Sequence, residues 1–227
     1  MGLVSLAAAC PRCPAPVART GPDDAWSCPE HGAVVPVWRT DEPSYDDFVD
    51  HLALAGTFPS YLPWPLGPGW QVTDFAVVGG ADGADRASAT LTAVSGTSEL
   101  DGPVEVLIVA EEAGVGLGAR CAGTIGHDPG PEVGDGPATT KVRVASQQVP
   151  LWSVSPWSDT AVNGRTGGEG EWDRSVVVGE TDGRWLWLVL RPASAILMLR
   201  DEWILRDVSA LGPSLVELSF GGPGTSW

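Results

Sequence analysis

The sequence predicts an α+β protein that is mainly β, in which a small N-terminal module precedes a larger antiparallel β-rich domain with one or two helices. Three observations predict this class. The 29 glycines and 20 prolines favour many turns and short strands over long helices. Several segments alternate between apolar and polar residues, as strands with one buried face do. Two short cysteine-containing turns precede this strand-like region.

Composition limits the classes of partner. A chain of 227 residues can hold one ordinary domain and a small module, and 43% hydrophobic residues are enough for a packed core. The formal charge is −16, with 29 acidic residues against 13 basic ones that are scattered along the chain. Nucleic-acid binding needs a local basic surface, so we expect no nucleic-acid partner. The same charge disfavours anionic membranes, and no apolar run reaches the ~20 residues of a spanning helix. We therefore expect a cytoplasmic protein that does not bind membranes.

The first candidate site is a pair of short turns that carry metal-ligand residues. Cys10-Pro11-Arg12-Cys13 is followed, after fourteen residues, by Cys28-Pro29-Glu30-His31 and then Gly32. Two residues between ligands let one tight turn aim both side chains at a single ion about 2.0–2.3 Å away. Proline sets the backbone dihedral of such a turn, and glycine permits the conformation needed after it. Because four protein ligands close the coordination shell, the pattern predicts a structural zinc site formed by Cys10, Cys13, Cys28 and His31.

Other uses of these cysteines fit the sequence less well. A redox pair at Cys10 and Cys13 would lack a surrounding βαβ pattern and would leave the second turn unexplained. Disulfides need an oxidising compartment, and no export signal is visible. Residues 1–9 resemble a short lipoprotein signal before Cys10, but they lack a positively charged segment and are too short. Chance spacing is a further alternative, and iron is the alternative metal, although zinc is the usual occupant of such closed shells.

The chain divides into four predicted segments: a zinc-ribbon-like module at 7–40, a linker and helix at 41–60, the β-rich domain at 61–220 and a disordered tail at 221–227. Residues 34–38 are predicted to form a short strand that completes the module. Ser44 begins the helix in a capping-box arrangement with Asp47, and Gly56 ends it. His51 lies beside the apolar face of this helix, and we expect it to be a packed or solvent-edge histidine rather than a catalytic one.

Strand-like segments fill the β-rich domain. The apolar run at 104–110 suits a central strand that is buried on both faces. Asp182-Gly183 lies between two β-rich segments and is a strong hairpin signal. The predicted strands are 72–78, 87–93, 104–110, 141–145, 151–154, 175–179, 184–190, 196–199 and 202–205, with a glycine-containing loop at 158–173. The last two, 196–199 and 202–205, are expected to pair with each other around Arg200-Asp201.

A second candidate site follows the predicted central strand, at Glu111-Glu112-Ala113-Gly114-Val115-Gly116-Leu117-Gly118-Ala119-Arg120. Its G-x-G-x-G spacing differs from a dinucleotide fingerprint, which needs G-x-G-x-x-G, a full helix and a second parallel strand. We therefore expect a glycine-shaped structural loop rather than a nucleotide site. Cys121 and His127 are an alternative nucleophilic pair, but a buried free cysteine is the commoner outcome. The polar residues of most interest here are Glu111, Glu112, Arg120 and His127.

Eleven tryptophans are many for this length. Trp185 and Trp187 share one face of a predicted strand, so we expect them in the core. Trp64 and Trp157 are flanked by prolines and loops, which favours exposed positions in a ligand or partner site.

Several motifs occur in a distinctive order: C-P-x-C, C-x-x-H, L-P-W-P-L followed by G-W, V-A-E-E-A-G-V-G-L-G-A-R, and P-L-W followed by W-L-W. Together they resemble an uncharacterised actinobacterial family of unknown function, and the resemblance covers nearly the whole chain. It implies a cytoplasmic protein with an N-terminal metal knuckle and a domain of no assigned activity. It assigns no catalytic residues.

Two functions fit these observations. The first is a non-enzymatic binding or adaptor protein, with a structural zinc ion and an unknown protein or small-molecule partner near the tryptophan-bearing loops. The alternative is an enzyme that acts on a small polar substrate, with a site near residues 111–128. An enzyme needs acid–base groups that converge in a concave pocket, whereas an adaptor would show an exposed apolar patch lined by Trp or Leu. We favour the first hypothesis.

Overall fold

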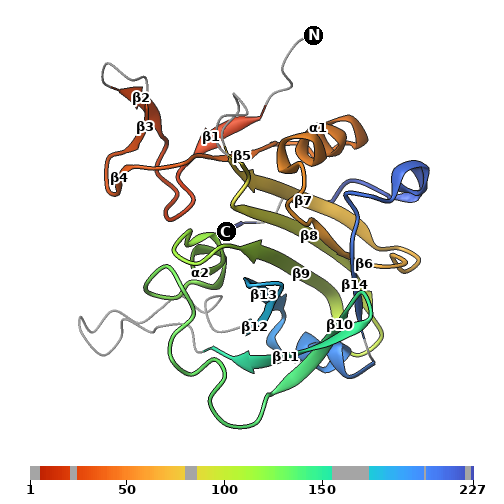
Figure 1. Ribbon diagram of the computed structural model, residues 1–227. Helices are drawn as coiled ribbons and strands as arrows, with labels where there is room; N and C mark the ends of the chain where they lie inside the picture. The colour runs from red at the N-terminus through yellow and green to blue at the C-terminus, as the bar shows by residue number, and fades with distance from the viewer. Residues whose placement is uncertain (1–5, 21–24, 80–85, 155–173, 202, 223–225) are drawn as a thin grey trace.

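One large curved sheet forms most of the molecule (Figure 1). The structure, a computed structural model, describes residues 6–20, 25–79, 86–154, 174–201, 203–222 and 226–227. The predicted loop at 158–173 and Trp157 lie outside these residues. The sheet has eleven strands in the order β1 (Ala7–Ala9), β5 (Val37–Arg39), β7 (Gln71–Val78), β8 (Ala89–Ser98), β9 (Gly102–Glu111), β13 (Arg184–Arg191), β12 (Ser175–Thr181), β11 (Gln147–Ser153), β10 (Thr140–Val144), β14 (Ile204–Asp207) and β6 (Tyr61–Pro63).

Neighbouring strands of this sheet run antiparallel, apart from the parallel pair β10 and β14. Three short strands form a second sheet near the N-terminus: β2 (Ala18–Thr20), β3 (Ala25–Cys28) and β4 (Gly32–Ala33). The helices of the described residues are α1 (Tyr45–Ala55), α2 (Leu117–Ala122) and the 3₁₀ helices η1 (Ala193–Asp201) and η2 (Gly212–Glu217). The predicted class, mainly β with few helices, is confirmed.

The helix predicted at Ser44 is α1. The Ser44 side chain accepts a hydrogen bond from the backbone N–H of Asp47, and the helix ends at Gly56, whose φ of 60° suits glycine. His51 is buried on the face that packs on the sheet, where its ring stacks on Phe48. It is therefore a packed histidine.

The large sheet places side chains in two apolar cores, one on each face. In the central strand β9, Val106 and Ile108 belong to one core, and Leu107 and Val109 belong to the other. This double burial confirms the prediction for 104–110. The first core packs against α1 and is closed by β6, which folds back over β8. Two buried threonines of β8 hold it there by donating hydrogen bonds to backbone carbonyl groups: Thr90 to Pro59 and Thr92 to Tyr61.

One predicted strand is wrong and another is right only in part. Within 34–38, the Val34 N–H donates to the carbonyl oxygen of Trp26 in β3 (3.0 Å), as expected for the N-terminal module. Val37 and Trp38 instead belong to β5, which pairs with β1 and β7 in the large sheet, because Val37 is buried in the second core. Segment 196–199 lies in η1, where Ala195 and Leu199 are buried four residues apart, and so short an apolar run does not distinguish helix from strand. Segment 202–205 overlaps β14, which pairs with β10 and β6 rather than with 196–199.

Candidate metal centre

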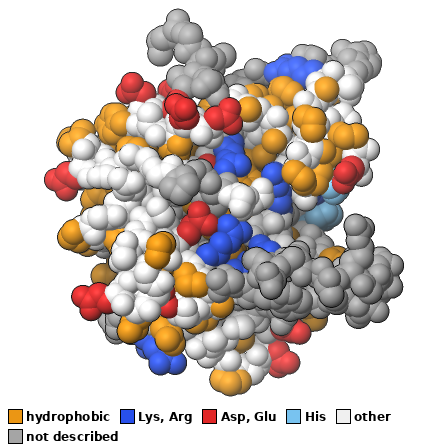
Figure 2. Space-filling view, turned by 180° about the vertical axis from the view of Figure 1, so that it is seen from behind, with side chains coloured by type: hydrophobic (Ala, Val, Ile, Leu, Met, Phe, Trp, Pro, Cys, Tyr) orange, Lys and Arg blue, Asp and Glu red, His pale blue; other side chains and the backbone are white. Residues whose placement is uncertain are grey.

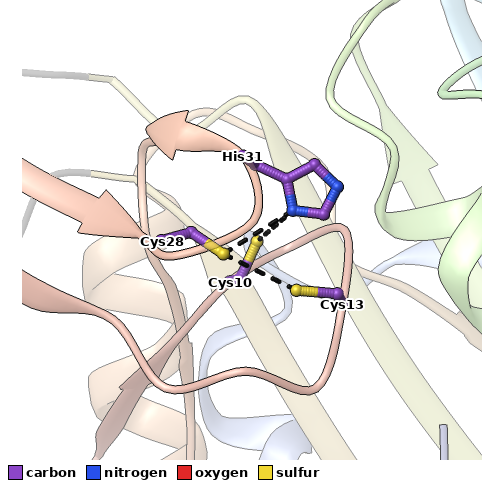
Figure 3. Close-up of side chains that lie close together, drawn as sticks. All are labelled: Cys10, Cys13, Cys28 and His31. Carbon is purple, nitrogen blue, oxygen red and sulfur yellow. Dashed lines mark hydrogen bonds between the residues drawn. The ribbon is translucent and has the colours of Figure 1, made fainter.

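The two predicted metal-binding turns come together at the N-terminal end of the molecule. Cys10 and Cys13 follow β1, Cys28 is the last residue of β3, and His31 lies in the turn between β3 and β4. The turn leads into β4 through Gly32, whose φ of 68° is a left-handed conformation that glycine adopts without strain. The four side chains converge on one point (Figure 3).

The spacing of the four ligand atoms fits a tetrahedral metal site. His31 Nδ1 lies 3.6 Å from Cys10 Sγ and 3.6 Å from Cys28 Sγ, and the Sγ atoms of Cys13 and Cys28 are also 3.6 Å apart. All four atoms lie within 4.8 Å of one another. Metal bonds of about 2.3 Å to sulfur and about 2.0–2.1 Å to nitrogen give tetrahedral edges of about 3.5–3.8 Å. The cysteines are free thiols rather than disulfides, so the group can hold a metal ion.

The surroundings give two of the thiols different pKa values. Burial raises the pKa of Cys13 to about 11. Burial acts in the same direction on Cys28, but hydrogen bonds from the backbone of Glu30 and from the side chain and backbone of His31 outweigh it and lower the pKa to about 6. Because the thiolate is the metal-binding form, binding of a metal ion by these cysteines would release their protons.

Two arginines fasten the metal centre to the glycine-rich loop after β9. Arg12, within the first turn, donates hydrogen bonds to the carbonyl oxygens of Val115 (3.1 Å) and Gly114 (2.8 Å). In the opposite direction, Arg120 of α2 donates to the carbonyl oxygen of Cys10 over 2.6 Å. The two regions predicted as separate candidate sites are therefore in direct contact.

Glu111 holds the glycine-rich loop from inside. Its side chain is buried, and Oε2 accepts hydrogen bonds from the backbone N–H groups of Leu117 (2.8 Å) and Gly118 (3.1 Å). Among the described residues, Oε1 has no hydrogen-bond partner. Burial raises the pKa of Glu111 to about 7, against the opposing effect of the two N–H groups. Glu111 thus orders the first turn of α2 and changes its protonation near neutral pH.

Gly118 is required for close packing. A Cβ atom at this position would lie 2.3 Å from Cδ1 of Trp187, which is fully buried as predicted. Helix α2 can therefore approach β13 only where it lacks a side chain. This contact supports the prediction of a glycine-shaped structural loop.

The other candidate residues of this region have separate environments. Glu112 forms an ion pair with Arg86. His127 is exposed, and its ring centroid lies 6.5 Å from that of His31. Cys121 is a free cysteine buried in the second core, and burial raises its pKa. Its burial matches the commoner outcome expected for it and does not favour nucleophilic chemistry with His127.

Trp64 is half-buried against the first core rather than exposed, and it lines an apolar groove of about 300 Å³ on a different part of the molecule, where β6, β14 and η1 meet. Trp70 and Trp203 pack edge-to-face in this groove, with ring centroids 5.8 Å apart. Within the described part of the chain, its lining holds no charged residue and comprises Pro63, Trp64, Pro65, Leu66, Gly67, Trp70, Met198, Trp203 and Ile204. Trp157, the other predicted tryptophan, is not among the described residues.

A cluster of side chains around Trp227, in the segment predicted to be a disordered tail, was not predicted from the sequence. The Trp227 indole N–H donates to Asp74 Oδ2 over 2.7 Å. The guanidinium carbons of Arg39 and Arg120 lie 4.6 and 4.4 Å from the Trp227 ring, in cation–π contact. Basic side chains gather toward the middle of the face opposite to that of Figure 1 (Figure 2). A lone tryptophan after glycine, serine and threonine gives no signal of such contacts in sequence.

The comparisons with known proteins agree with the motif order. No curated protein and no solved structure matches the chain. None of the helices in the described ranges has the length and apolar character needed to cross a membrane. A family model described as a family of unknown function (DUF6758) matches residues 4–226. This match covers nearly the whole chain and confirms the resemblance to a family of unknown function. The chain therefore belongs to the DUF6758 family of unknown function.

Proposed function

We propose that the protein is a non-catalytic binding protein in which Cys10, Cys13, Cys28 and His31 hold one structural zinc ion. The observation that carries the metal assignment is the set of four ligand atoms within 4.8 Å of one another. Three thiolates and one imidazole are typical ligands of zinc. Because protein atoms fill all four positions, no position remains for water or substrate, and the ion stabilises the fold rather than catalysing a reaction.

The zinc ion would replace an apolar core in the N-terminal module. The small sheet β2–β3–β4 is mostly exposed, and the buried residues of the module's own cluster are the three ligand cysteines. Metal binding would therefore supply much of the module's folding free energy, as in zinc-ribbon proteins. A reducing compartment such as the cytoplasm would keep these thiols available.

Cobalt(II) substitution tests whether the coordination shell is closed. We expect cobalt in the wild-type protein to show the intense visible absorption of a tetrahedral thiolate site, with no change when azide is added. His31→Ala should open one position and make the spectrum sensitive to azide. His127→Ala, which removes the neighbouring histidine that is not a ligand, should behave as wild type. A wild-type spectrum that shifts with azide would overturn the structural assignment.

The binding role rests on the groove that contains Trp64. Aromatic-lined grooves bind proline-rich segments, because the polyproline II conformation is already formed and costs little entropy on binding. The described lining of the groove carries no charge, but the chain has a net charge of −16, which favours a partner with basic residues beside the bound segment. We therefore propose a proline-rich segment with basic flanks as the ligand of this groove.

The indole N–H signals in a two-dimensional NMR spectrum test this ligand class. The probe is a synthetic decaproline peptide with two arginines at each end. We expect the signals of Trp64, Trp70 and Trp203 to shift on titration, and Trp64→Ala to weaken binding at least tenfold. Trp26→Ala, in the N-terminal module, is the matched control and should bind as wild type. An absence of shifts at millimolar peptide would contradict the proposed site.

The alternative, an enzyme with a site near residues 111–128, has less support. Three of the four polar candidates already make contacts with a structural role: Glu111 orders α2, Glu112 pairs with Arg86, and Arg120 binds the Cys10 carbonyl group. The fourth, His127, is exposed, and the apolar groove at Trp64 contains none of these residues.

A further inference from the structure

A second cleft, of about 390 Å³, lies between the β10–β11 hairpin and η1. Its volume is within the range of small-molecule sites, about 300–1,000 Å³. Its lining comprises Ala138, Thr140, Lys141, Val142, Arg143, Gln148, Pro150, Leu199 and Arg200. The cleft shares no lining residue with the groove at Trp64 and contains no residue of the metal centre.

Among the described residues, the charged members of this lining are all cations: Lys141, Arg143 and Arg200. This is opposite to the composition of the chain, in which 29 acidic residues outnumber 13 basic ones and Lys141 is the single lysine. Lys141 and Arg143 lie two residues apart on β10 and therefore on the same face, where they are paired in register with Pro150 and Gln148 of β11. Arg200 comes from η1, so only the fold brings the three cations to one cleft.

The rest of the lining is mainly apolar. Ala138 and Pro150 contribute exposed apolar surface, whereas Val142 and Leu199 are only 1% exposed and present little surface to a ligand. Gln148 accepts a hydrogen bond from Lys141 Nζ over 2.9 Å, which keeps the ammonium group on this face of the hairpin. The cleft thus combines apolar walls with guanidinium groups, whose planar N–H donors match the oxygen atoms of carboxylate, sulfonate and phosphate groups.

We propose that this cleft binds a small organic anion that carries its acidic group on an apolar body. The three cations would contact the acidic group, and the apolar walls would contact the body. An inorganic anion would use only the first of these contacts. Because the net charge of −16 repels anions at long range, binding must depend on local contacts and should weaken as salt screens them. This inference does not depend on the proposed role of the Trp64 groove or of zinc.

Fluorescence titration with 8-anilinonaphthalene-1-sulfonate, an aromatic sulfonate, tests this proposal in the zinc-loaded full chain. We expect saturable binding with one site per chain, and at least tenfold weaker binding by the Arg143→Gln, Arg200→Gln double variant. Arg206→Gln removes one positive charge on the exposed face of β14 outside the cleft, as Lys141→Gln does within it, and it should bind within twofold of wild type. Trp64→Ala should also bind as wild type, which separates this cleft from the apolar groove.

Two further measurements show whether the affinity comes from the acidic group or from the apolar body of the ligand. The uncharged analogue N-phenyl-1-naphthylamine should bind wild type at least tenfold more weakly than the sulfonate, and inorganic phosphate should displace the sulfonate only at much higher concentration. If circular dichroism shows that the double variant is not folded, Lys141→Gln, at an exposed position, takes its place. We expect Lys141→Gln to bind the sulfonate at least threefold more weakly than wild type does. Equal binding by the double variant or by Lys141→Gln, or equal affinity for the uncharged analogue, would overturn the proposal.

Discussion

Glu111 is a buried carboxyl group that orders the start of α2 through two backbone N–H groups. Its pKa rises from an ordinary value of 4.5 to about 7, chiefly because burial disfavours the charged form. Between these two values the folded state binds more protons than the unfolded state does. The contribution of Glu111 to the free energy of unfolding is therefore full below pH 4.5 and is lost as the pH rises through 7.

Glu111→Gln should remove this pH dependence. Between pH 5.5 and 8 we expect the free energy of unfolding of wild type to fall by about 2 kcal/mol relative to the variant. Urea unfolding of both proteins at saturating zinc measures the difference. The other titratable groups are the same in the two proteins, so their contributions to the pH dependence cancel. Glu112→Gln, which alters the neighbouring surface carboxylate, is the matched control. A Glu111→Gln difference that stays constant across this pH range would contradict the assignment.

Gly118→Ala tests the contact between α2 and β13. The new Cβ would lie 2.3 Å from a ring atom of the buried Trp187, so the helix or the ring must move. Overpacking of this kind costs about 1–3 kcal/mol. Gly130→Ala adds the same methyl group where no atom lies within 4 Å, and we expect a change below about 0.5 kcal/mol. Equal unfolding free energies for the two variants in urea would show that Gly118 has no packing role.

At the scale of elements, the contact between the first metal-binding turn and the loop before α2 is the main new feature. Arg12 donates to two carbonyl groups of the loop, and Arg120 donates back to Cys10. A bound metal ion would order the turn that contains Cys10 and Arg12, and this turn is hydrogen-bonded both to the loop and to Arg120 of α2. Metal binding should therefore reduce local opening of α2.

Hydrogen exchange of residues 114–122 measures this coupling. In wild type we expect removal of zinc by a chelator to accelerate exchange in this segment at least tenfold. Arg12→Ala should still bind zinc, since the ligands remain, but its exchange in α2 should respond much less to the chelator. Arg19→Ala, which removes an arginine stacked on Trp26 elsewhere in the module, should respond as wild type. An undiminished response in Arg12→Ala would mean that the coupling does not pass through Arg12.

The elements that the sequence predicts correctly are those with a local signal. Ser44, Asp47 and Gly56 mark both ends of α1, and Asp182-Gly183 forms the turn between β12 and β13 with positive φ at both residues. The apolar run at 104–110 gives the central strand. The four metal ligands are also visible in sequence, because each pair lies within one turn.

Contacts between distant segments were not predictable in the same way. The pairing of β5 with β1 and β7 depends on burial of Val37 by the whole sheet, and the pairing of β14 with β10 joins segments that no hairpin connects. The same holds for Arg12 with Val115 and for Trp227 with Asp74. Single arginines and tryptophans carry no periodic pattern, so only the fold reveals their partners.

At the scale of the whole molecule, the N-terminal module and the β-rich domain are joined by shared strands as well as by side chains. Residues 7–40 contain the small sheet and also β1 and β5 of the large sheet. The metal centre therefore lies next to the main body rather than on a free appendage. Loss of the metal should accordingly lower the stability of both parts, with the larger effect on the module, which has few buried apolar residues of its own.

The central claim is that one structural zinc ion is bound by the four predicted ligands. Elemental mass spectrometry of protein purified under reducing, chelator-free conditions tests it most directly, on wild type and on Cys28→Ala. We predict about one zinc per wild-type chain, and loss of the zinc together with folded structure of the module in the variant. Wild-type protein without zinc, or a Cys28→Ala variant that retains the full amount, would contradict the account.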